Sequence, residues 1–256
     1  RLTTLPLSSA CSLYQHFAVK HYERKPHLSV EELKSLLIAQ SAKFASRITE
    51  SKQTIAEIGR IMFTKDQMVV LTHGRSSCVE RLLLNAWLNH KKRFIVIITQ
   101  QETLNTHGQQ TITNDEDRLL ASLSACGIPA SLSSVSLVAS LMERVDLVVV
   151  GAEAVAENGG IINRVGTATV ALVAAQRCIP FYVVCEACKF GRAISLDNKA
   201  SSLFSMQPAQ PQRDSLIGDC WEPLDYTCPE YINLLFTDLG VFTPCSVSDE
   251  LAKLFN

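Results

Sequence analysis

The stretch that decides the fold runs from residue 146 to residue 187 and reads DLVVVGAEAVAENGGIINRVGTATVALVAAQRCIPFYVVCEA. It begins with an apolar run at 147–150 and ends with a second short run of β-branched and aromatic residues at 179–187. An apolar helical pattern at 170–175 lies between them. A strand, a helix and a second strand in this order are typical of a βαβ unit, whose strands are parallel.

The same alternation extends along most of the chain. Short β-rich runs occupy residues 68–73, 93–100, 128–133, 146–153 and 179–187, and helical patterns separate them. The central runs are apolar throughout, which is typical of strands covered on both faces. We therefore predict an α/β domain over residues 66–256, with a parallel sheet and helices on both faces. The tail predicts one more strand, a turn at Pro244 and a short helix after Ser246 or Ser248.

Residues 29–62 predict helical structure, in which the apolar residues from Ile55 to Met62 either extend one long helix or form a second one. Ser29 and Glu32 have the spacing of a capping box, in which each side chain bonds the other residue's backbone. Apolar residues follow at helical spacing, among them Leu33, Leu36, Leu37, Phe44 and Ile48. Such a stripe is more often a core face than a binding site. We predict a helical N-terminal domain over residues 1–65, with ERKPHL at 23–28 as a linker.

Composition excludes several classes of protein. The 256 residues are 47% hydrophobic and 19% charged, which supports one or two domains with a large core. A net charge of -1 gives no electrostatic footprint for nucleic acid or an anionic membrane. No apolar run approaches the roughly 20 residues that span a bilayer, and no signal-peptide pattern follows Arg1. We therefore expect a cytoplasmic protein.

The cysteines and the common cofactor motifs give mainly negative information. Nine cysteines are present, and only Cys185 and Cys188 form a C-x-x-C pair. We expect reduced, mostly buried thiols, with a redox role for this pair as the alternative. The sequence contains no G-x-x-x-x-G-K-[ST], no G-x-G-x-x-G and no H-E-x-x-H. It therefore predicts no metal site and no resident cofactor.

Three loops follow strands of the predicted sheet: THGRSS at 72–77, TQQETLNTHG at 99–108 and the loop at 150–167. Ligands of open parallel sheets bind at this edge, and helix N-termini there attract phosphate or carboxylate. Two helix starts carry a basic residue beside small or hydroxyl residues: Arg75, Ser76 and Ser77 at the first, and Arg164, Gly166 and Thr167 at the second. The alternative is ordinary capping without a ligand. His73, at a strand end, is more often structural than catalytic in such a place.

Residues 146–190 resemble the signature region of a family with two branches. One branch comprises isomerases of methylthioribose 1-phosphate or ribose 1,5-bisphosphate. The other comprises the alpha, beta and delta regulatory subunits of eukaryotic translation initiation factor 2B. The tail WEPLDYTCPEYINLLFTDLGVFTPCSVSDELAKLF at 221–255 and VVLTHGRSSCVERLL at 69–83 look like the alpha subunits. The resemblance covers about three quarters of the chain. It implies a helical N-terminal domain followed by a Rossmann-like domain, in agreement with the pattern above.

The resemblance also implies that catalytic groups are missing. The isomerases use a cysteine in the first loop and an aspartate after the fourth strand, and these positions fall on Gly74 and Glu153. The family's N-K-x-G-T becomes residues 163–167, with Arg164 as the cation, and its T-R-P is matched by 101–103. The sequence thus predicts a ligand pocket without a catalyst. Its expected residues are His73, Gly74, Arg75, Ser76, Glu153, Asn163, Arg164, Gly166 and Thr167.

The function implied by the resemblance is that of a non-catalytic regulatory subunit. The complex would exchange GDP for GTP on initiation factor 2, and this subunit would help sense the phosphorylated alpha chain of that factor. Expected partners are the other subunits of factor 2B, a second copy of the chain in a homodimer, and a phosphorylated small metabolite that is not turned over. The alternatives are a sugar-phosphate aldose-ketose isomerase with rearranged groups and a stand-alone metabolite sensor. Gly74 argues against the first of these.

Overall fold

The computed structural model describes residues 29–100, 103–104, 110–111, 114–191 and 224–255, together with parts of 11–19. The linker expected at 23–28 and most of the second loop, namely Gln101, Glu102 and residues 105–108, lie outside these ranges.

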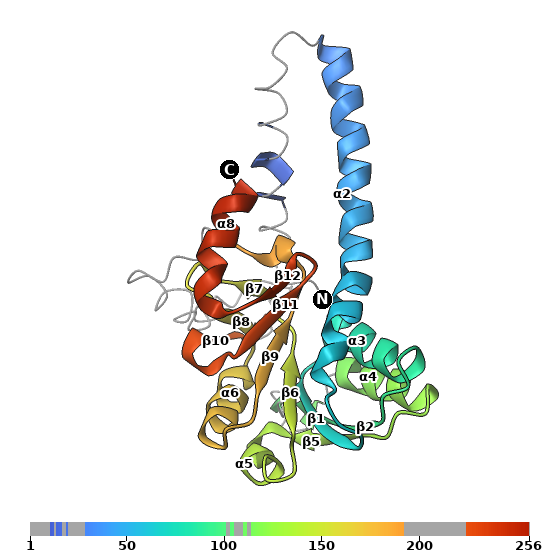
Figure 1. The fold of residues 1–256 in the computed structure, drawn as a ribbon, viewed down its shortest axis with the longest axis vertical. Helices are drawn as coiled ribbons and strands as arrows, with labels where there is room; N and C mark the ends of the chain where they lie inside the picture. The colour runs from blue at the N-terminus through green and yellow to red at the C-terminus, as the bar shows by residue number, and fades with distance from the viewer. Residues whose placement is uncertain are drawn as a thin grey trace, which may run out of the picture.

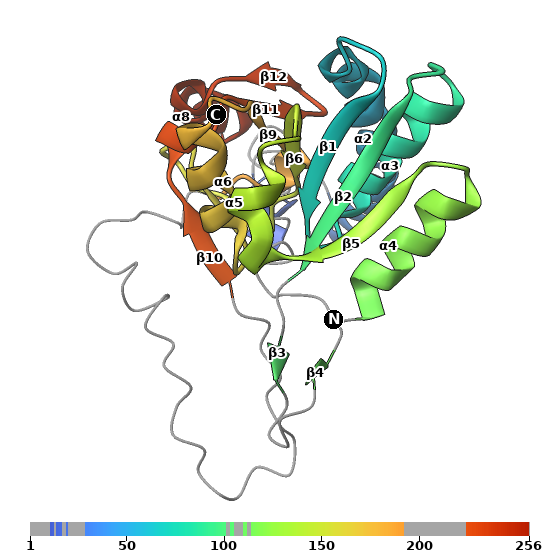
Figure 2. The ribbon, with the colours of Figure 1, turned by 90° about the horizontal axis from the view of Figure 1, so that it is seen from below.

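The core of the molecule is a seven-stranded sheet with the order β12-β11-β9-β6-β1-β2-β5 (Figures 1 and 2). Every neighbouring pair is parallel except β11 and β12, which are antiparallel. The predicted α/β fold is therefore confirmed. Its strands are β1 (Met68–His73), β2 (Phe94–Gln100), β5 (Ala130–Ser134), β6 (Leu147–Val150), β9 (Phe181–Val184), β11 (Leu234–Thr237) and β12 (Gly240–Phe242).

Helices cover both faces of this sheet, as Figure 2 shows. Each face has its own apolar core, and buried residues of the central strands contribute to both. One face carries the C-terminal turns of α2 (Val30–Gly59), α3 (Ser77–Leu88) and α4 (Asn114–Ala125), and the other carries α5 (Val138–Leu141), α6 (Thr167–Gln176) and α8 (Val247–Phe255). In the part of the chain that the structure describes, no helix is long and apolar enough to cross a membrane.

The strand order reverses between β1 and β6. The chain starts with β1 at the centre, moves outward through β2 to β5, and returns to β6 on the other side of β1. The carboxyl ends of β1 and β6 therefore diverge into loops that lead to opposite faces of the sheet. This is the position at which open α/β sheets bind their ligands.

Helix α2 forms as predicted and extends away from the sheet (Figure 1). Its capping box is present: the backbone N–H of Ser29 donates to Glu32 Oε2 at 2.9 Å, and that of Glu32 donates to Ser29 Oγ at 3.3 Å. Among the α2 residues whose burial the structure describes, the buried ones lie in the last turns, where Ile55 and Ala56 pack against α3 in the core. The division of the chain at residue 65 stays a prediction.

Three regions contain more structure than the sequence predicted. The loop at 150–167 and the tail build a separate antiparallel sheet, with the order β10-β8-β7. The prediction of a single strand in the tail was wrong, because these strands are only two to four residues long and show no alternating pattern. The added strands are β7 (Ala154–Val155), β8 (Ile161–Arg164) and β10 (Leu224–Thr227). In addition, β3 (Thr103–Leu104) pairs with β4 (Gln110–Thr111) between β2 and α4.

Short 3-10 helices connect several of these elements. They are η1 (Arg60–Met62), η2 (Val135–Leu137), η3 (Ala187–Lys189), η4 (Pro229–Tyr231) and η5 (Pro244–Ser246). The last of them packs closely on the loop between β7 and β8, because a Cβ atom placed on Gly159 would lie 2.2 Å from the carbonyl oxygen of Pro244. The C-terminal tail therefore packs directly against the loop between β7 and β8.

A pair of glycine substitutions tests this close approach. Gly159 and Gly127 both have a left-handed backbone, with φ of 85° and 77°, but a Cβ on Gly127 would meet nothing within 4 Å. Gly127→Ala should cost about 1–2 kcal/mol for the backbone conformation alone. Gly159→Ala should cost about 1–3 kcal/mol more, because the backbone at Pro244 must move. Urea unfolding of both variants measures the difference, and equal losses would contradict the packing described.

Candidate ligand site at the sheet edge

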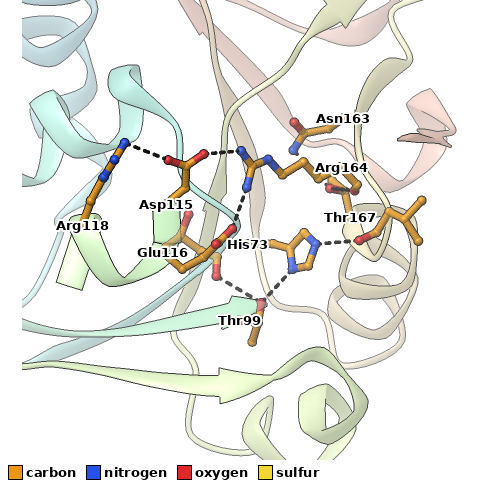
Figure 3. Close-up of polar contacts among 10 residues, drawn as sticks. His73, Thr99, Asp115, Glu116, Arg118, Asn163, Arg164 and Thr167 are labelled. Carbon is orange, nitrogen blue, oxygen red and sulfur yellow. Dashed lines mark hydrogen bonds and ion pairs between the residues drawn. The ribbon is translucent and has the colours of Figure 1, made fainter. Parts of the chain in front are cut away.

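The ring of His73 is buried where β1 ends, and it joins three segments of the chain. Its Nε2 lies 2.9 Å from the carbonyl oxygen of Val165, and its Nδ1 lies 3.1 Å from Thr99 Oγ1 (Figure 3). A carbonyl oxygen only accepts hydrogen bonds, so Nε2 carries a proton. Burial lowers the pKa of His73, and it outweighs the opposing effects of the Val165 carbonyl and the Glu116 charge. The neutral ring is a brace between β1, β2 and the loop before α6, which is the structural role expected.

Gly74 follows His73 in a left-handed conformation, with φ of 65°. Its N–H continues the sheet by donating to the carbonyl oxygen of Thr99 at 2.9 Å. A Cβ atom at this position would lie 3.0 Å from Cδ of Arg164 and 3.6 Å from Glu116 Oε1. A side chain on residue 74 would therefore combine a strained backbone with a crowded contact, directly beside the cation of the expected pocket.

Arg164 ends β8 and is held by two carboxylates from the first turn of α4 (Figure 3). One terminal nitrogen lies 2.7 Å from Glu116 Oε1 and the other lies 3.2 Å from Asp115 Oδ2. Burial alone would raise the pKa of Asp115, but Arg164, with smaller contributions from Arg75 and Arg118, lowers it below its usual value. Arg164, which the sequence analysis expected to bind a phosphate, thus has anionic partners within the chain.

The start of α6 is capped by a carboxylate from β10. Asp225 Oδ2 accepts hydrogen bonds from the backbone N–H of Gly166 at 2.8 Å and of Ala168 at 3.0 Å. Burial raises the pKa of Asp225, and it outweighs these two bonds. Beside it, Asn163 Nδ2 donates to Thr167 Oγ1 at 3.1 Å, and that hydroxyl donates to the carbonyl oxygen of Arg164. These polar side chains brace the loop from within.

The start of α3 also has internal partners. Ser76 is its N-cap, with its Oγ accepting from the backbone N–H of Val79 at 3.5 Å. Arg75 pairs with Glu80 of the same helix at 3.1 Å. Glu153 follows β6 at the same edge of the sheet, where its backbone N–H donates to the carbonyl oxygen of Ile162 at 2.9 Å. The expected residues therefore share one edge. Gly74 lies against Arg164 and Gly166 against His73, and Thr167 bonds both Asn163 and the Arg164 carbonyl.

Sequence reasoning missed four residues of this edge: Thr99, Asp115, Glu116 and Asp225. Acidic residues in the first turn of a helix are favoured by the helix dipole, so the acidic residues at 115–117 gave no sign of a further role. Asp225 lies 59 residues beyond Gly166 in the chain. No spacing rule connects such positions.

A second polar cluster follows β9 at the same edge. Lys189 Nζ donates to the carbonyl oxygen of Ala152 at 2.8 Å and lies 3.1 Å from Glu186 Oε2. Burial would lower the pKa of Lys189, but the Glu186 charge outweighs it and raises that pKa. Glu186 also lies 3.9 Å from Lys52 of α2. The cluster therefore links the loop after β6, the loop after β9 and the base of α2.

The cysteines near this cluster are not activated. Burial raises the pKa of Cys78 and of Cys185 strongly, and it raises that of Cys188 to about 11. These thiols stay protonated at neutral pH, and the described cysteines form no disulfide. This favours reduced structural thiols over a redox role for the C-x-x-C pair. Among the residues that the structure describes, no three His, Cys, Asp or Glu side chains gather in a way that could hold a metal ion.

The fold and the edge together define the class: a doubly wound α/β domain with a candidate ligand site at its switch point, approached by a long N-terminal helix. The chain matches the initiation factor 2 subunit family over residues 2–244 and belongs to it.

Relatives support this assignment. The chain is 35% identical to the translation initiation factor eIF2B subunit alpha of Dictyostelium discoideum, over 98% of this chain and 78% of that protein. It is 28% identical to the ribose 1,5-bisphosphate isomerase of Archaeoglobus fulgidus, over 95% of this chain and 74% of that enzyme. Its fold is similar to a crystal structure of the tetrameric eIF2B beta2-delta2 complex from C. thermophilum. There the TM-score is 0.71 at 22% identity, covering 96% of this chain and 72% of the other.

The buried His73 gives a prediction about pH. The pKa of His73 in the folded protein lies below the ordinary value of 6.5, so the unfolded chain binds this proton more readily. The free energy of unfolding therefore decreases as the pH falls below 6.5. The loss is at most about 1.4 kcal/mol per pH unit for one group. His73→Gln keeps a donor for Val165 and cannot titrate. Between about pH 7.5 and about pH 5.5, urea unfolding should therefore show a larger loss of stability in the wild type than in the variant. The remaining histidines are common to both proteins, so an equal loss would contradict the assigned neutral state.

Proposed function

We propose that this chain is a non-catalytic regulatory subunit of the complex that exchanges GDP for GTP on initiation factor 2. Its similarity to alpha subunits of factor 2B over nearly the whole chain supports this proposal. A second alpha subunit, from Caenorhabditis elegans, is 32% identical over 84% of this chain and 67% of that protein. The subunit would act in the cytoplasm, together with the other subunits of factor 2B, and would help sense phosphorylated initiation factor 2.

The observation that carries the proposal is the geometry of Gly74. The related isomerases, by resemblance, place their catalytic cysteine at this position. Here the residue has no side chain, its φ is 65°, and the space that a Cβ would need is bordered by Arg164. Proton transfer requires a group within hydrogen-bond reach of the substrate, and glycine offers none. A binding role therefore fits this edge better than isomerisation does.

A homodimer is the assembly that we propose for the chain alone. The β11–β12 hairpin forms the edge of the main sheet, and it exposes two large apolar side chains, Leu239 at 48% and Val241 at 37%. An edge strand with exposed apolar residues invites pairing with another chain. A two-fold interface is the commonest way to cover such a surface.

We further propose that the switch point binds a small phosphorylated metabolite without turning it over. The residues that would hold it are His73, Gly74, Arg75, Ser76, Glu153, Asn163, Arg164, Gly166 and Thr167. Arg164 would contact the phosphate, because a guanidinium can bind it through two parallel hydrogen bonds.

The subunit role is tested by co-purification. The tagged chain is expressed together with the beta and delta subunits of factor 2B from the same organism. A regulatory subunit should elute with both in a single complex through gel filtration. A stand-alone metabolite sensor should elute alone, and that result would reject the proposed role.

The absence of isomerase activity is tested with ribose 1,5-bisphosphate. We expect no ketose product from the wild type or from Gly74→Cys, because the new thiol would meet a strained backbone and Arg164. The Archaeoglobus fulgidus isomerase serves as the positive control. Turnover of about 1 per second by the wild type, a usual enzyme rate, would show that the catalytic groups have been rearranged and not lost.

A further inference from the structure

We propose that Glu116 and Asp115 are an internal competitor for Arg164, so that a phosphorylated ligand binds at the switch point only by displacing these two carboxylates. The inference rests on the proposed ligand site and adds a residue-level determinant of its affinity. Neither acidic residue belongs to the motifs through which the chain resembles its family. Both are placed at the site only by the fold, 48 and 49 residues before the arginine.

The first argument is the geometry of the guanidinium. A phosphate would use the two terminal nitrogens of Arg164 as a fork. In the structure these nitrogens already contact Glu116 Oε1 at 2.7 Å and Asp115 Oδ2 at 3.2 Å. Two separate carboxylates thus occupy the positions that two oxygens of one phosphate would take. The two terminal nitrogens of Arg164 cannot bond a phosphate and these two carboxylates at the same time.

The second argument is burial. The side chains of Glu116 and Arg164 are only 3% and 19% exposed, so water screens their charges weakly. A phosphate that approached Arg164 while Glu116 stayed in place would meet a buried like charge at close range. Keeping Glu116 in place while Arg164 turned to a ligand would cost the buried carboxylate its ion pair with this arginine. Ligand binding therefore requires Glu116 to turn away from the arginine.

The third argument is that only the first turn of α4 has to move. The helix is anchored by Leu119 and Leu123, which are fully buried in the core. Asp115 is 28% exposed and already lies 3.5 Å from Arg118, a solvent-exposed cation of the same helix. Once released from Arg164, Asp115 keeps this second partner. A change of side-chain conformation at the helix start thus exchanges the internal anions for a phosphate, while the helix stays packed.

The consequence is selectivity for charge. A phosphomonoester carries nearly two negative charges at neutral pH and can replace two carboxylates at one arginine. A singly charged carboxylate ligand offers no gain over Glu116. We therefore expect dianionic phosphate ligands to bind, with an affinity that the competing residues keep low.

Isothermal titration calorimetry with inorganic phosphate and with ribose 5-phosphate tests the proposal. Glu116→Gln should lower the dissociation constant at least about tenfold, because it removes a charge-assisted bond to Arg164. Asp115→Asn should act in the same direction with a smaller effect. Glu143→Gln is the matched control, since it removes an exposed carboxylate that pairs with Arg177 at the surface. Arg164→Ala should abolish binding in every background.

The outcomes separate the two proposals. Binding by the wild type with an unchanged dissociation constant in Glu116→Gln and Asp115→Asn would overturn the competitor role and leave the ligand site standing. A failure of every variant to bind either probe would overturn the ligand site and the competitor role together. If Glu116→Gln does not fold, as judged by circular dichroism, the partly exposed Asp115 carries the test alone, and an unchanged constant there overturns the proposal.

Discussion

The reversal of strand order between β1 and β6 is the constraint on which this structure depends. Both strands are buried on their two faces, so their apolar sequences are fixed by packing and leave no room for polar groups along their length. Polar residues can appear only where the strands end. The end of β1 and the loops after β6 and β9 consequently bring His73, Glu153 and Lys189 to a single edge, although they are far apart in the sequence.

Groups gathered at such an edge must find partners, because a buried polar group without one is costly. The chain solves this with its own acidic residues. Arg164 has Glu116, the start of α6 has Asp225, and Lys189 has Glu186. The edge therefore supplies anionic partners for its own cations and for the start of α6. An isomerase needs acid and base groups that face its substrate, whereas this edge uses its charges mainly to hold the loops in place. That distribution of charge agrees with a family in which some members are enzymes and others are subunits of an assembly.

The sequence predicted the parts of the fold that depend on neighbouring residues. The boundaries of β1 and the capping box of α2 follow from local apolar runs and from a three-residue spacing, and both are found where expected. Strands β7, β8 and β10 were missed because each is too short for a periodic pattern. The partners of Arg164 and Gly166 were missed for another reason. They come from elements that only the folded sheet brings together, and an acidic residue in the sequence looks the same whether it faces water or a buried arginine.

Helix α2 has a mechanical consequence for this edge. It is one unbroken helix of 30 residues, fixed at its C-terminal end by Ile55 and Ala56, with Lys52 beside Glu186. At about 1.5 Å per residue, the part from Val30 to Ser51 is a rod roughly 33 Å long. A rotation of about 5° at the base would displace the far end of such a rod by about 3 Å. Small shifts at the strand ends would therefore move the N-terminal end of α2 by about the length of a hydrogen bond.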